Sequence, residues 1–137
     1  MAKINNLVQD WKELASRAID YHEAANKLLP HNLFQNAIEQ AHLSLELIMK
    51  AAIIKAGGTP PRSHDLVHIA ETKIKGKKFL IKNIKTSRHI RNSFSAVFSA
   101  WSMHDRYRRL PQDPYDAEQL IESYEKVYVW IRTNFVD

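Results

Sequence analysis

Basic side chains gather in one part of this sequence, where they could bind phosphate. Eleven Lys or Arg and a single acid, Asp105, lie between residues 73 and 109, so this segment carries a formal charge of +10, whereas the rest of the chain carries −5. Such an asymmetry favours an anionic partner on the basic side. The alternative is a solvated lysine-rich face that only keeps the chain in solution. Composition alone leaves both interpretations open.

Arg91 is the basic residue whose position is hardest to explain by solvation alone. In a helix over residues 78–104, the turn of about 100° per residue places Arg91 near Ile84 and Phe98, at the edge of the apolar face. Arginine is rarely buried without a partner, so we expect a carboxylate, a partner chain or an anion beside it. Arginine can hold phosphate bidentately, and Tyr107 offers a stacking surface. We therefore predict a non-catalytic phosphate- or nucleotide-binding site with the candidates Arg88, Arg91, Asn92, His104, Arg106, Tyr107 and Arg108.

Other kinds of site find little support in the sequence. Glu39 and His42 form a Glu-x-x-His element, but di-iron bundles use two such elements with two further glutamates, so no metal is expected. The motifs of zinc proteases, P-loop enzymes and serine hydrolases do not occur. The chain has no Cys, which excludes disulfides and thiolate chemistry. We therefore expect no cofactor, and we expect His22 to be a histidine at the edge of the core.

The elements that must position these residues are helical, because apolar residues recur at helical spacing and Gly is rare. Pro30 and the pair Gly57-Gly58 mark helix ends, Asn32 is a plausible cap, and Ser63 or Asp65 can cap a short helix that begins at Leu66. Trp101 is expected in the core. The sequence therefore predicts a single domain over residues 1–137 with the all-α fold of an antiparallel up-down four-helix bundle. Its long helices are expected at 5–29, 32–55, 78–104 and 115–134, with one additional short helix between the second and third.

The location of the protein is also constrained by hydropathy. The first residues lack the long apolar core of a signal peptide. No uninterrupted apolar stretch approaches the roughly 18 residues that a membrane span needs. We therefore expect a cytoplasmic protein without a membrane partner.

Four stretches of the chain resemble the HEPN domain family of small helical bundles that often accompany nucleotidyltransferases. The stretch NAIEQAHLSLELIMKAAIIKAGG resembles the second helix of the family, with Glu46 and Lys50 in the family's Glu and Lys places. Residues 60–66, PPRSHDL, resemble its Pro, His-Asp-Leu connection. Residues 105–107, DRY, resemble the Arg-Tyr end of its third helix, and DAEQLIESYEKVYVWI resembles its last helix. Together these stretches span nearly the whole chain.

The resemblance implies a bundle of four to five helices, usually a homodimer, that acts on or near nucleotides or RNA. Many relatives work in toxin–antitoxin pairs, and active relatives are metal-independent ribonucleases. The active relatives use an Arg, usually followed by a polar residue, and a His four to six residues beyond. Arg91-Asn92 resembles the first half of this motif, but Ala96, Val97 and Phe98 stand where the His is expected. His104 lies too far along to replace it.

Three functional hypotheses follow. The first is a non-catalytic HEPN-domain protein that dimerises and presents the surface from Lys78 to Arg109 to RNA, to a nucleotide or to a nucleotidyltransferase partner, in a toxin–antitoxin-like or defence system. The second is a metal-independent ribonuclease with a degenerate motif, in which His104 or His89 supplies the acid–base group. The third is a structural, antitoxin-like interaction module whose exposed aromatic residues meet a partner protein.

Overall fold

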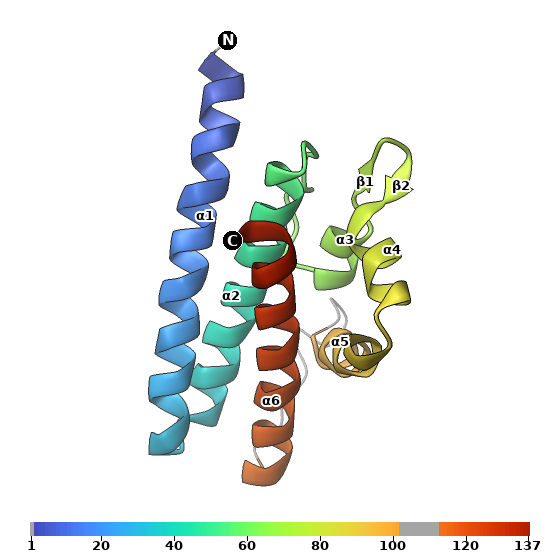
Figure 1. Ribbon diagram of the computed structural model, residues 1–137. Coiled ribbons are helices and arrows are strands. Elements are labelled where there is room, and N and C mark those ends of the chain that lie inside the picture. The colour runs from blue at the N-terminus through green and yellow to red at the C-terminus, as the bar shows by residue number, and fades with distance from the viewer. Residues whose placement is uncertain (1, 102–112) are drawn as a thin grey trace.

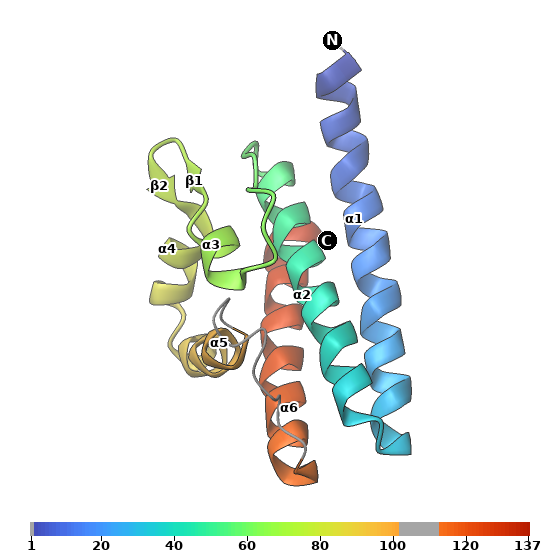
Figure 2. The ribbon, with the colours of Figure 1, turned by 180° about the vertical axis from the view of Figure 1, so that it is seen from behind.

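Three long helices run side by side and form one half of the protein (Figures 1 and 2). They are α1 (Ala2–Leu28), α2 (Phe34–Lys55) and α6 (Pro114–Ile131). The computed structural model describes residues 2–101 and 113–137, with side chains from residue 11 onward in those ranges. The 3₁₀ turn η1 (Leu29–His31) joins α1 to α2, and so short a link makes the two helices antiparallel neighbours.

Shorter elements cover one side of α2 and α6. In chain order they are α3 (Leu66–Ala70), the strands β1 (Lys73–Ile74) and β2 (Lys77–Lys78), α4 (Phe79–Thr86) and α5 (Arg88–Ala100). After α6 the chain continues into the π-helix η3 (Arg132–Val136), where the carbonyl of Val136 accepts a hydrogen bond from Lys55 Nζ at 2.7 Å. The expected all-α fold, with helices packed in a bundle, is confirmed.

The core is built around α2, which has more buried residues than any other helix that the structure describes. This helix packs against α1, α6, α3 and η3, and Ile38, Leu45 and Ile48 have no exposed surface. Trp101 is buried, as expected. Asn32, expected to cap α2, instead takes a left-handed conformation with φ 60°, and Leu33 occupies the cap position without a side-chain hydrogen bond. At α3 the choice between two caps is decided, because Asp65 accepts a hydrogen bond from the backbone of Val67.

The expectation of one continuous third helix over residues 78–104 is wrong. Ser87 adopts an extended conformation with φ −110° and ψ 90°, and it separates α4 from α5. At the end of α4, Thr86 Oγ1 donates to the carbonyl of Asn83 at 2.9 Å, and Ser and Thr side chains of this kind compete with the helical backbone. In Figure 1 α5 is seen almost along its axis while α1, α2 and α6 run down the view, so α5 crosses the long helices.

The hairpin β1–β2 is a second departure from the sequence expectation, which contains helices but no strand. Lys73 pairs with Lys78 and Ile74 with Lys77 in antiparallel register. The two residues between the strands, Lys75 and Gly76, have φ of 54° and 78°. Positive φ at both central positions is the signature of a type I′ turn, which suits a two-residue hairpin.

Candidate functional site

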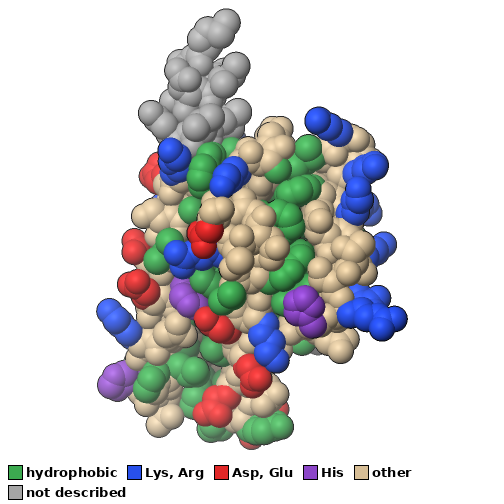
Figure 3. Space-filling view, in the orientation of Figure 1, with side chains coloured by type: hydrophobic (Ala, Val, Ile, Leu, Met, Phe, Trp, Pro, Cys, Tyr) green, Lys and Arg blue, Asp and Glu red, His purple; other side chains and the backbone are tan. Residues whose placement is uncertain are grey.

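Eight cationic side chains follow one another along the hairpin, α4 and α5. We call them the basic strip: Lys73, Lys75, Lys77, Lys78, Lys82, Lys85, Arg88 and Arg91. All eight are exposed, and no acid occurs between residues 73 and 101. Figure 3 shows Lys and Arg gathered along the edge of the molecule that these elements form. Within the described ranges, Lys78 alone of the eight forms an ion pair, at 3.2 Å from Glu71.

The hairpin concentrates charge, because its register sets two lysines opposite each other. Lys73 and Lys78 are directly paired across the strands, and like charges in this arrangement destabilise a hairpin. The start of α5 also concentrates positive charge. Its first turn contains no acid, and no side chain caps it. The positive end of a helix dipole favours anions rather than cations. A bound anion would therefore relieve repulsion at both places.

The three site candidates on α5 are all exposed. Arg88 and Asn92 lie near the middle of its solvent side, and Arg91 lies toward one margin. Arg91 was expected to need a carboxylate, a partner chain or an anion. Among the residues that the structure describes, its side chain forms no ion pair and no hydrogen bond. Within residues 11–101 and 113–137, therefore, no carboxylate accounts for its position.

The remaining candidates, His104, Arg106, Tyr107 and Arg108, lie outside the described residues. The ribonuclease motif can be followed on α5 as far as Phe98. Val97, one of the positions where the motif needs its His, is fully buried in the core. Its apolar role in packing explains why the sequence has no acid–base group there.

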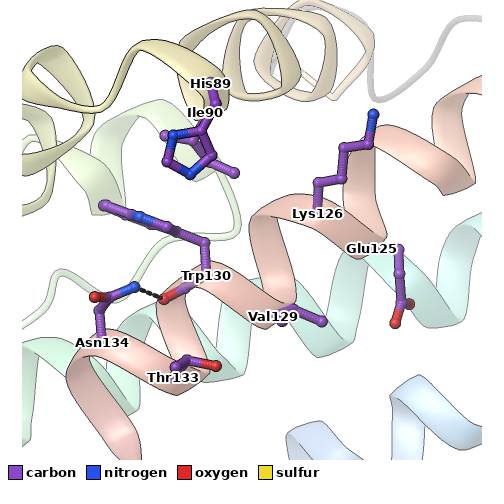
Figure 4. A pocket seen from close by; sticks show the side chains of 8 residues that line it. All are labelled: His89, Ile90, Glu125, Lys126, Val129, Trp130, Thr133 and Asn134. Atoms are coloured by element: carbon purple, nitrogen blue, oxygen red, sulfur yellow. Dashed lines mark hydrogen bonds between the residues drawn. The ribbon is translucent and has the colours of Figure 1, made fainter.

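A groove of about 620 Å³ opens between the start of α5 and the outer face of α6 (Figure 4). His89 and Ile90 line it from α5, and the residues lining it from α6 and η3 are Glu125, Lys126, Val129, Trp130, Thr133 and Asn134. Its lining is mostly apolar, and Val129 remains 48% exposed. Sequence reasoning considered His89 only as an acid–base group and missed Trp130. The available signal was the pair Val129-Trp130, which adds apolar residues outside the inward stripe of α6.

The buried carboxylate of Glu46 joins two other residues that carry the family resemblance. Glu46 is 4% exposed, and its oxygens accept hydrogen bonds from Lys50 Nζ at 3.3 Å and from His64 Nδ1 at 2.8 Å. His64 lies in the loop between α2 and α3, next to the capping residue Asp65. These residues therefore fix the loop on α2, which is a structural role.

A second polar chain crosses the core from α1 to α6 and α2. Tyr124 donates its hydroxyl proton to Ser44 Oγ at 2.9 Å, and Ser44 donates to the carbonyl of Ala18 at 2.8 Å. His22 Nδ1 lies 2.8 Å from the Tyr124 hydroxyl, so that nitrogen must carry a proton. Burial raises the pKa of Tyr124 far above its usual range. His22 is half-buried at the core edge, as expected, and it stacks on Tyr128 at 4.1 Å.

The Glu-x-x-His element gives no metal centre in the described part of the chain. Glu39 is exposed, and His42 makes an edge contact with Trp101 at 5.5 Å between ring centres. Among the described residues no three His, Asp or Glu lie close enough together to hold a metal ion. No helix in the same residues is long and apolar enough to cross a membrane.

Comparison with known families matches residues 11–134 to the HEPN domain. The chain belongs to the HEPN domain family. The match covers all described elements except the first turns of α1 and the last residues of η3, and the helical bundle agrees with the HEPN fold. HEPN domains are associated with RNA-related toxin–antitoxin and defence functions. Comparisons with curated proteins and with solved structures gave no significant match.

Proposed function

We propose that this HEPN protein binds RNA or a nucleotide through the basic strip and does not cleave it. The observation that carries the proposal is the run of eight exposed cations without an acid from residue 73 to residue 101. Phosphate contacts by Lys and Arg supply most of the non-specific affinity of proteins for nucleic acids. The alternative is a solvated lysine-rich face that only keeps the chain in solution. Such a role does not require the cations to gather on one edge, whereas binding of a phosphate backbone does.

The test is a titration of labelled single-stranded RNA with the full chain at two salt concentrations. Counterion release predicts that affinity falls about ten-fold or more between about 50 and 200 mM salt. The double charge reversal Lys82→Glu with Lys85→Glu should abolish binding. The matched control reverses two exposed cations of α1, Arg17→Glu with Lys27→Glu, and should retain most of the affinity. Absence of binding, or binding that ignores salt, would remove the proposal.

The proposal assigns no catalytic residue, and the site candidates Arg88, Arg91, Asn92, His104, Arg106, Tyr107 and Arg108 are proposed to bind phosphate or nucleotide. The competing ribonuclease hypothesis makes a different prediction. If His104 or His89 supplies the acid–base group, purified protein cleaves RNA in EDTA, and Arg91→Ala abolishes the cleavage. We expect intact RNA after long incubation with the wild-type chain.

The proposal also includes a homodimer and a nucleotidyltransferase partner in a toxin–antitoxin-like or defence setting. The family's association with RNA and nucleotidyltransferases supports the proposed partner. Light scattering after size-exclusion chromatography measures the mass of the assembly directly. Co-purification with a nucleotidyltransferase encoded beside this chain tests the partner. A stable complex with an unrelated neighbouring protein, without RNA binding, would favour the antitoxin-like interaction module instead.

A further inference from the structure

We propose that the groove between α5 and α6 holds an unpaired base of single-stranded RNA whose phosphates lie on the basic strip. This inference rests on the proposed function and adds a base-binding subsite to it. The groove and the strip meet at the start of α5, because Arg88 belongs to the strip and His89 lines the groove. The volume of about 620 Å³ lies within the range of about 300–1,000 Å³ that is usual for small-molecule sites.

Trp130 supplies a stacking surface that is already fixed in place. Its ring makes edge contacts with Phe94 at 5.7 Å and with Phe135 at 5.2 Å between ring centres. The indole is half-buried and lines the groove, while the imidazole of His89 lies opposite it (Figure 4). Bases stack well on aromatic rings that need little ordering on binding, and such stacking tolerates any base. The two rings therefore offer two aromatic surfaces in the groove on which a base can stack.

Polar groups at the rim can contact the base edge and its phosphate. Asn134 Nδ2 donates to the carbonyl of Trp130 at 2.8 Å, so its second amide proton and its carbonyl oxygen are available. Thr133 adds a hydroxyl. Lys126 extends along the groove toward α5 in Figure 4 and is 3.6 Å from Glu122, an exposed pair that is weak and can exchange for phosphate.

Glu125, the one carboxylate among the described residues that line the groove, does not oppose an RNA strand strongly. Glu125 points away from His89 and Trp130 in Figure 4. Its Oε2 lies 3.4 Å from His22 Nε2 on α1. A duplex keeps its bases paired and stacked, so it cannot place one in the groove without unpairing, whereas a single strand can. The basic strip by itself would bind both forms, and the groove therefore predicts a preference for single strands.

The experiment compares three fluorescently labelled RNAs of equal length: a single strand, a duplex and a strand with abasic sites in place of the bases. The wild-type chain should bind the single strand about five-fold or more tightly than the abasic strand. His89→Ala and Trp130→Leu should each reduce that ratio and leave the affinity for the abasic strand unchanged. The control is His68→Ala, an exposed histidine of α3 away from the groove, which should change nothing.

The outcomes separate this inference from the proposed function. If wild-type protein binds none of the RNAs, both fail. If it binds all three with equal affinity, the basic strip stands and the base-binding subsite is overturned. His89 is exposed, so His89→Ala tests the subsite even if Trp130→Leu does not fold. If Val129→Glu dissociates a dimer and leaves the RNA affinity of each chain unchanged, the groove is an interface between copies and the inference is also overturned.

Discussion

Tyr124 shows how a single buried side chain ties three helices together. Its hydroxyl receives a hydrogen bond from His22 of α1 and gives one to Ser44 of α2. Glu46 does the same for the loop that leads to α3, since it binds Lys50 on its own helix and His64 in the loop. Buried polar groups of this kind are costly unless they are satisfied. Replacing a single atom of the Tyr124 hydroxyl or of the Glu46 carboxylate should therefore lower the stability of the fold.

Tyr124→Phe removes both hydrogen bonds of the hydroxyl without removing the ring. We expect a loss of about 1–3 kcal/mol in the free energy of unfolding at neutral pH, measured by urea denaturation. The folded-state pKa of Tyr124 is raised by burial, so the folded chain keeps a proton that the unfolded chain loses above about pH 10. The hydroxyl's contribution is thus full below that pH and declines as pH rises.

The difference between wild type and Tyr124→Phe should consequently shrink at strongly alkaline pH. Tyr115→Phe is the matched control, because Tyr115 lies on the same helix and is 67% exposed. The control should track wild type at every pH. A gap for Tyr124→Phe that is constant from neutral to alkaline pH would contradict the role assigned to burial.

Glu46→Gln tests the anchoring of the loop between α2 and α3. The amide keeps the size of the side chain but cannot accept charge-assisted hydrogen bonds from Lys50 and His64 at full strength. We expect a loss of about 1–3 kcal/mol and faster amide exchange in the loop. Glu39→Gln, at an exposed position of the same helix, should be neutral. Equal stability of the two variants would show that the cluster contributes nothing.

At the scale of elements, two backbone details place the basic strip. The extended Ser87 turns the chain so that Ile84 and Ile90 are both buried on either side of the break. The hairpin packs close to the end of α2, where a Cβ added at Gly58 would lie 2.7 Å from Ile74 Cγ1 and 2.9 Å from Ile53 Cγ2. Such distances are shorter than real packing allows, so the hairpin depends on a glycine there.

Gly58→Ala should therefore destabilise the protein by about 1–3 kcal/mol, because the new methyl group pushes the hairpin away from α2. Thermal denaturation measures the change. Thr59→Ala, at the exposed neighbouring position, should stay within about 0.5 kcal/mol of wild type. The double variant with Ile74→Ala should cost less than the sum of the two single changes, since the shortened side chain frees space. Additive losses would argue against a clash at this contact.

At the scale of the whole molecule, the chain separates its charges. The basic strip occupies the edge formed by the hairpin, α4 and α5, while the acidic excess lies elsewhere in the sequence (Figure 3). A one-sided field of this kind steers anions toward one surface and is screened by salt. Binding through it should respond to each cation by a similar amount.

Single Lys→Ala changes along the strip should weaken RNA binding by similar factors for every sequence tested. A lysine that contacts a phosphate should also lower the slope of log affinity against log salt by about 0.7 for a single strand. Lys77→Ala, Lys82→Ala and Lys85→Ala probe strand β2 of the hairpin and α4. Lys27→Ala on α1 is the control and should leave the slope unchanged. A loss confined to one RNA sequence would indicate base readout at that lysine instead.

The sequence by itself determined the all-α class, the burial of Trp101 and the concentration of positive charge, because apolar periodicity and composition are local properties of the chain. It also identified Asp65 as one of two possible caps and placed His22 at the core edge. The sequence did not predict that Asn32 fails to cap α2, and it did not predict the helix break at Ser87. Local propensity near Ser87 permits a helix, and packing on both sides of the break, together with the hydrogen bond from Thr86 to Asn83, decides against one.

The tertiary structure alone decided which residues meet. It joined Glu46 to His64 across a loop, and it brought His89 of α5 against Trp130 of α6 to form the groove. These residues are distant in sequence, and their contact depends on the angle at which α5 crosses the bundle. That angle follows from side-chain packing between helices, which a pattern of spacing along one chain does not contain.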